Sequence, residues 1–149
     1  MKKALLVACA LTMLPLAGHA QFAKPEDAIK YRKAAYTVMG AHFGRIGEVV
    51  KGNVPYNAKE TEANAALVEA LAKLPFTAFG KGTESGGDTR AKPEVWREAD
   101  KFHAGAEKMQ QAVTQLYAAS KTGDLAQVRT AFGAAGQTCK ACHDNYRSQ

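Results

Sequence analysis

Four segments of this 149-residue chain carry apolar side chains at spacings of three and four residues. This spacing places the apolar side chains on one face of an α-helix, because an α-helix completes a turn every 3.6 residues. No segment shows the period-two alternation that is typical of a half-buried strand. The pattern therefore predicts an all-α chain.

Proline, glycine and capping residues indicate where these helices begin and end. Pro25 suits the first turn of the first helix, and Gly52 follows its last apolar residue. Pro75 should stop the second helix, Pro93 should open the third, and Asp124 is a good N-cap for the fourth. The expected helices span residues 25–50, 58–74, 93–120 and 125–146.

The connection over residues 77–92 is the longest irregular stretch, with four glycines and little periodicity. The first and third connections are short. Four amphipathic helices joined in this way favour an antiparallel four-helix bundle. Two glycines, at 133 and 136, lie inside the fourth helix, where either close helix packing or a bulky group near the backbone would explain them.

The first twenty residues have the features of an export signal rather than of a fold. Two lysines precede an apolar run over residues 4–14, and residues 18–20 form a small-x-small cleavage pattern. The apolar run is shorter than the ~20 residues that a membrane-spanning helix needs. We therefore expect cleavage before Gln21 and a single periplasmic domain over residues 21–149.

The expected mature chain has no further apolar segment that predicts a membrane span. It carries 18 basic and 14 acidic side chains, which are scattered along the sequence. Because the basic residues form no cluster, the sequence does not indicate a nucleic-acid-binding protein. A mildly basic surface would still favour an acidic partner protein.

A C-x-x-C-H motif lies in the fourth expected helix, formed by Cys139, Cys142 and His143. On a helix these three side chains fall within an arc of roughly 100° and face the same side. Two thiols there can attach to the vinyl groups of a haem while the imidazole binds its iron. The motif therefore predicts one covalently attached haem c per chain.

Two other uses of the motif stay open. A redox dithiol or a disulfide would use the cysteines alone, although a thioredoxin-like dithiol lies at a helix start beside a strand. A structural zinc site needs four protein ligands, and the motif supplies three. The remaining histidines of residues 21–149 are His42 and His103, both expected at a surface or an interface. The adjacent histidine and the export signal favour haem.

Beyond the motif, five stretches of the sequence resemble the class II c-type cytochromes, in particular their cytochrome c′ branch. The stretches are FAKPEDAIKYRKAAY (22–36), HFGRIGEVVKG (42–52), LPFTAFGKGTE (74–84), PEVW (93–96) and TAFGAAGQTCKACHDNYR (130–147). The resemblance covers essentially the whole expected mature chain. It implies a homodimer of four-helix bundles, each with a haem between the helices near one end. Glycines 40, 44 and 47 of the first helix would permit close contact between subunits.

The resemblance also implies roles for individual side chains. Arg32 matches an arginine that contacts a haem propionate, an anion that a buried guanidinium needs, and Lys33 would assist from the rim. Arg147 matches a basic residue beside the axial histidine. The position that holds a methionine ligand in low-spin members is Tyr36 here. The other side chains implied in the distal wall are Met39, Phe76 and Phe79.

Tyr36 decides the expected function. A neutral phenol, with a reference pKa of ~10, is a poor iron ligand, although tyrosinate binds iron in catalases. We therefore expect five-coordinate iron with an apolar distal face that admits nitric oxide and carbon monoxide, unless the Met39 sulfur binds instead. One-electron transfer with a redox partner protein is the alternative function. Catalysis is not expected, since no distal acid–base groups are evident.

Overall fold

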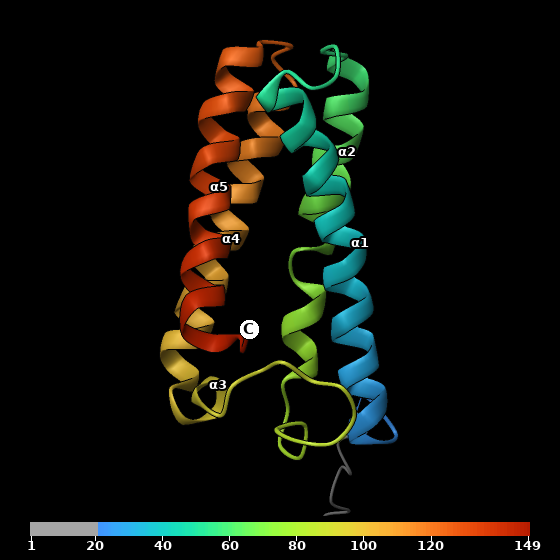
Figure 1. Ribbon diagram of the computed structural model, residues 1–149, viewed down its shortest axis with the longest axis vertical. Helices are drawn as coiled ribbons and strands as arrows, with labels where there is room; N and C mark the ends of the chain where they lie inside the picture. The colour runs from blue at the N-terminus through green and yellow to red at the C-terminus, as the bar shows by residue number, and fades with distance from the viewer. Residues whose placement is uncertain (1–20) are drawn as a thin grey trace, which may run out of the picture.

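A computed structural model describes residues 21–149, so the expected signal segment 1–20 lies outside the described residues. The long helices run side by side along one axis of the molecule (Figure 1). The elements are α1 (Pro25–Lys51), α2 (Ala58–Leu71), the 3₁₀ helix η1 (Leu74–Ala78), α3 (Glu94–Arg97), α4 (Ala99–Ser120) and α5 (Leu125–Tyr146). Within residues 21–149 there is no strand, only an isolated bridge between Ala91 and Arg147. The predicted all-α, four-helix bundle is confirmed.

Local signals set the ends of the first and last helices as predicted. Pro25 lies in the first turn of α1, and Gly52 ends α1 in a left-handed conformation with φ of 81°. Asp124 caps α5, because its side-chain oxygen accepts a hydrogen bond of 2.8 Å from the Ala126 N–H. Such caps satisfy backbone groups that have no partner within the helix. No helix described in residues 21–149 is both long and apolar enough to cross a membrane.

Two helix boundaries differ from the prediction. Helix α2 ends at Leu71, and the chain then tightens into η1, in which Pro75 occupies the first turn. The third predicted helix is interrupted at Glu98, whose φ of −117° and ψ of 42° are not helical. Trp96, on the short α3, donates a hydrogen bond of 3.0 Å to the Phe79 carbonyl. This contact ties α3 to the end of η1, and apolar spacing alone cannot reveal it.

The aliphatic core fills one half of the bundle, near the α1–α2 and α4–α5 connections. Its most buried side chains come from all four long helices and are at most 1% exposed: Ile46, Val68, Val113, Leu116 and Val128. Burying a side chain of this size contributes about 1.5–3 kcal/mol. The core therefore holds this half of the bundle together and leaves the other half to form a site.

Gly47 permits close packing between α1 and α5. A Cβ at Gly47 would lie 3.1 Å from Cζ of Phe132, and a Cβ at Gly136 would lie 3.9 Å from Cζ of Phe43. The Phe43 and Phe132 rings stack with centroids 4.3 Å apart. Gly47 is buried within the chain, so its expected role in subunit contact is wrong. A Cβ at Gly136 would make only ordinary contact and one at Gly133 would meet nothing within 4 Å, so close helix packing does not require glycine at either position.

This packing predicts opposite effects for two alanine substitutions in α1. Gly47→Ala should lower the free energy of unfolding by about 1–2 kcal/mol, because the stacked Phe132 ring cannot yield easily. Gly44→Ala should raise it by about 0.5–1 kcal/mol, because a Cβ there meets nothing within 4 Å and glycine is a poor helix former. Urea unfolding of both variants measures the difference. Equal stabilities of the two variants would show that the Phe132 ring moves aside.

Candidate functional site

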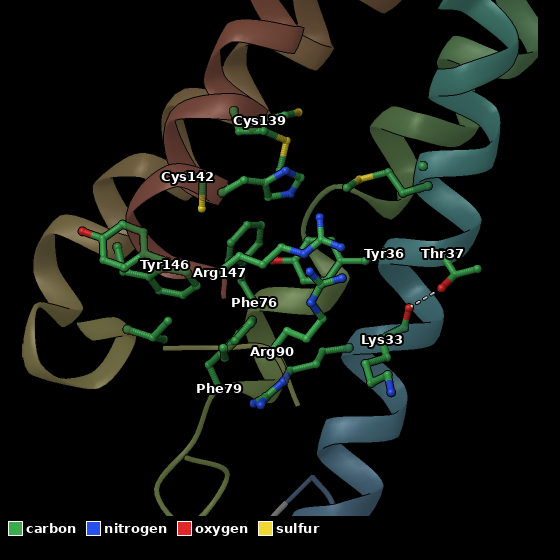
Figure 2. Close-up of a pocket in the computed structure, with 18 of the residues that line it drawn as sticks. Lys33, Tyr36, Thr37, Phe76, Phe79, Arg90, Cys139, Cys142, Tyr146 and Arg147 are labelled. Carbon is green, nitrogen blue, oxygen red and sulfur yellow. Dashed lines mark hydrogen bonds between the residues drawn. The ribbon is translucent and has the colours of Figure 1, made fainter. Parts of the chain in front are cut away.

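A cavity of about 510 Å³ lies between the helices in the other half of the bundle, next to the aliphatic core, whose Val68 and Val113 also line it. Figure 2 shows Cys139 and Cys142 on one side of it and Tyr36 on the other. Every site residue predicted from the sequence lines this cavity: Cys139, Cys142, His143, Arg32, Lys33, Tyr36, Met39, Phe76, Phe79 and Arg147. The structure thus brings the whole predicted set together, while the role of each residue toward a ligand stays a prediction.

The two cysteines lie on α5, are partly buried and form no disulfide. Burial raises the pKa of both thiols, and for Cys142 the neighbouring Cys139 adds to the rise. A catalytic dithiol needs a lowered pKa, since the thiolate is the nucleophile. These thiols are therefore poorly suited to redox exchange, and both lie in the cavity wall where a covalent attachment to a ligand is possible.

His143 lines the same wall and keeps an exposed surface. Partial burial lowers the pKa of His143, and the nearby Arg147 lowers it further. Both effects favour the neutral imidazole, which is the form that binds metals. Within residues 21–149, no group of three or more histidine, cysteine, aspartate or glutamate side chains is arranged to hold a metal ion. The zinc interpretation of the motif therefore finds no support.

The facing wall, on α1 and η1, is largely apolar. The Tyr36 ring meets the Phe76 ring edge-on, with centroids 6.0 Å apart, and Phe79 lies next to Phe76 at 6.3 Å. Burial raises the pKa of Tyr36 well above its usual value; the nearby Cys142 adds to this and Arg32 opposes it. The phenol is therefore neutral at physiological pH. Met39 lines the cavity and also packs against the aliphatic core.

Arg32 lies on α1 and is only 2% exposed. Its Nη1 donates hydrogen bonds to the Ala78 carbonyl (3.0 Å) and Thr83 Oγ1 (2.9 Å), and its Nη2 donates to the Thr83 carbonyl (2.9 Å) and Thr89 Oγ1 (2.7 Å). The guanidinium also lies 4.4 Å from the centroid of the Phe79 ring. The sequence predicted an anionic partner, but the acceptors within the chain are neutral oxygens. Arg32 therefore anchors the irregular loop to α1.

The charged side chains of the cavity lining are mainly cationic. They are Arg32, Lys33, Arg90 and Arg147, together with one carboxylate, Asp88. Asp88 forms an ion pair with Lys33 at the exposed rim. This surplus of positive charge complements the two propionates of a haem. Free thiols, a neutral imidazole, an apolar facing wall and cationic side chains together fit haem c.

Arg90 is a lining residue that the sequence analysis missed. It lies in the irregular loop, where neither periodicity nor a motif marks it. The other histidines lie outside the cavity lining, as predicted: Nδ1 of His42 is 2.8 Å from Oδ1 of Asn64, and His103 is exposed on α4.

A family model described as Cytochrome C′ matches residues 27–147 of the chain. The chain belongs to the cytochrome c′ family. Cytochrome c′ from Rubrivivax gelatinosus is 50% identical over 129 residues, which are 87% of this chain and 100% of that protein. The protein of the same name from Alcaligenes xylosoxydans xylosoxydans is also 50% identical over 129 residues, covering 87% of this chain and 99% of that protein.

Solved cytochrome c′ structures share the fold. The crystal structure from Rubrivivax gelatinosus matches with a TM-score of 0.84 at 50% identity, covering 86% of this chain and 100% of that chain. A nitric oxide complex of a cytochrome c prime mutant from Alcaligenes xylosoxidans matches with a TM-score of 0.81 at 48% identity, covering 87% of this chain and 99% of that chain. As a cytochrome c′, the chain carries covalently bound haem c. Bound haem supplies an iron that can take a small ligand or exchange one electron.

Proposed function

We propose that this cytochrome c′ reversibly binds nitric oxide, and also carbon monoxide, at a five-coordinate haem iron, and so acts as a sink or carrier of nitric oxide. In this proposal Cys139 and Cys142 hold the haem covalently and His143 holds its iron. The observation that carries the proposal is the neutral Tyr36 phenol in the apolar wall that faces the motif.

That wall favours uncharged diatomic ligands. Its rings and aliphatic groups offer few hydrogen bonds, so water and anions gain little by leaving solvent for it. A neutral phenol is a weak competitor for the iron. The Met39 side chain, the other competitor, is engaged against the aliphatic core. The distal side of the iron is therefore left to an external ligand.

Related proteins support this choice of ligand. Nitric oxide complexes of cytochrome c prime from Alcaligenes xylosoxidans include those of three mutants and of a ferrous variant. All four structures match this chain with a TM-score of 0.81. We transfer the ligand to this chain because its cavity combines the C-x-x-C-H motif with an apolar facing wall.

One-electron transfer is the second candidate, and the exposed cationic rim favours it. Lys33 and Arg90 both lie at the cavity and are exposed, so an acidic redox partner could dock there. We do not propose an enzymatic reaction. Peroxidase chemistry would need an acid–base pair facing the iron, whereas the facing wall consists of a phenol, a thioether and aromatic rings.

We also propose that residues 1–20 are an export signal removed before Gln21, leaving one periplasmic domain over residues 21–149. The full-length match to the Rubrivivax gelatinosus protein spans 129 residues, which is the length of that domain.

We propose a homodimer as well, supported by the exposed apolar side chains of Val38 on α1 and Leu67 on α2. Analytical ultracentrifugation measures the dissociation constant of the dimer.

The proposed function is tested by visible and EPR spectra of the purified exported protein. High-spin ferric iron that takes up CO after reduction is expected. The intact mass should equal residues 21–149 plus one haem. Low-spin iron without CO uptake would contradict the gas-binding proposal and favour electron transfer.

A further inference from the structure

We propose that Arg90 is a positioning residue for the cofactor, whose guanidinium binds a propionate of the haem and is held in place by Ser148. The proposal rests on haem occupying the cavity described above, as the proposed function also requires. It assigns a role to a loop residue that neither the motif nor the resemblance marks.

The loop around Arg90 pairs with the end of the chain. The Arg90 carbonyl accepts hydrogen bonds from the Ser148 N–H (2.9 Å) and hydroxyl (3.2 Å). The Lys92 N–H donates to the Tyr146 carbonyl at 3.0 Å, and Ala91 bridges to Arg147 between them. The loop is thereby fixed across the C-terminal end of α5, one turn beyond the axial-ligand candidate.

The Arg90 side chain is held by the same partner. Its Nε donates a hydrogen bond of 3.1 Å to the Ser148 carbonyl. Its terminal nitrogens, Nη1 and Nη2, have no hydrogen-bond or ion-pair partner among residues 21–149. Figure 2 shows this side chain extending into the cavity beside Arg147. Arg90 therefore presents a fork of donors with fixed orientation, which is the geometry that binds a carboxylate with two parallel hydrogen bonds.

Two of the other three cations of the cavity are engaged within the chain. Both terminal nitrogens of Arg32 already donate two hydrogen bonds each to the loop. Lys33 pairs with Asp88, the only carboxylate among the described lining residues. The Arg147 side chain is exposed and has no hydrogen-bond or ion-pair partner among residues 21–149. Arg90 and Arg147 are therefore the two lining cations without a partner for their terminal nitrogens in the described residues, and of the two only Arg90 is oriented by a side-chain hydrogen bond.

A haem supplies the missing anion, because its two propionates are its only charged substituents. Two guanidinium groups that extend into one partly enclosed cavity repel each other unless an anion lies between or beside them. A propionate at Arg90 relieves this repulsion. The contact fixes the edge of the porphyrin opposite to the thioether attachments, so the loop and the C-terminus take part in orienting the cofactor.

The test compares Arg90→Gln with Arg97→Gln in the holoprotein, measuring the midpoint reduction potential at low and high salt. Arg97 is an exposed arginine of α3 that does not line the cavity. Arg90→Gln should lower the potential, because an unneutralised propionate near the iron favours the ferric state. The shift should persist at high salt, since a direct contact is screened less than a surface charge. Arg97→Gln should give a smaller shift that salt abolishes.

Two further measurements distinguish a direct contact between Arg90 and a propionate from mere proximity. The carboxylate band in the redox-induced infrared difference spectrum should shift in Arg90→Gln and stay near its position in Arg97→Gln. Ser148→Pro, which removes both the N–H and the hydroxyl donor, should reproduce the lowered potential. Ser148→Ala keeps the N–H donor and should leave the potential close to that of the unmodified protein.

Equal potentials and an unmoved carboxylate band in Arg90→Gln and Arg97→Gln would overturn the proposal. The outcome is independent of gas binding. If the unmodified protein proves low-spin while Arg90→Gln still shifts the potential, the proposed function fails and the role of Arg90 stands. If CO binds normally and Arg90→Gln has no effect on the potential, the proposed function stands and the role of Arg90 fails.

Discussion

Replacing Tyr36 with methionine is expected to convert the haem iron from high-spin to mainly low-spin. Tyr36 faces the motif across the cavity on the rigid helix α1, so a thioether at this position lies on the distal side without rearrangement of the backbone. Thioether sulfur is a good axial ligand in c-type cytochromes. An internal ligand worth more than ~1.4 kcal/mol lowers CO affinity roughly tenfold or more. EPR of the ferric form and CO titration of the ferrous form measure both effects.

Tyr36→Phe is the matched control, because it keeps the ring and removes only the hydroxyl group. Its iron should stay high-spin and its CO affinity close to that of the unmodified protein. If Tyr36→Met is as high-spin as Tyr36→Phe, Tyr36 does not occupy the distal position, and the proposed arrangement around the iron is wrong.

Replacing Arg32 with alanine is expected to lower the free energy of unfolding by about 3 kcal/mol, a large effect for a single substitution. The change removes four hydrogen bonds from a charged donor, and each such bond contributes about 1.5–3 kcal/mol before relaxation of the loop recovers part of the loss. It also removes the contact with the Phe79 ring. Urea unfolding of the holoprotein measures the loss, and amide exchange over residues 79–92 should become faster.

Lys33→Ala is the control for this substitution. Lys33 is the next residue of α1, but its side chain is 47% exposed and pairs with an aspartate side chain that is 90% exposed. An exposed pair of this kind contributes little to stability, because water and salt screen it. If Arg32→Ala costs no more than Lys33→Ala, the loop does not depend on its anchor. In that case we could no longer distinguish Arg32, as the residue that anchors the loop, from Arg90, as the residue that binds a propionate.

The resemblance to the class II c-type cytochromes identified candidate side chains of the haem pocket, which the spacing of apolar residues could not do. Tyr36, Met39, Phe76 and Phe79 would look like ordinary core residues in any bundle, because large apolar side chains on an inward helix face are usually core. Their presence together in one cavity is a property of the fold. The family match and the shared cavity support the same assignment, and the Tyr36 variants test it.

The sequence by itself determined the four long helices, the ends of the first and last of them and the shared face of the motif, because each depends on residues within one or two turns of one another. Apolar spacing, Gly52, Asp124 and the C-x-x-C-H sequence are all of this local kind. Only the tertiary structure decided what Arg32 binds, where Arg90 lies and why Gly47 lacks a side chain. Arg90 and Ser148 are 58 positions apart, and Arg32 contacts residues 46 to 57 positions away. Such contacts leave no periodic trace in the sequence, because they arise where the loop crosses between the two walls of the cavity.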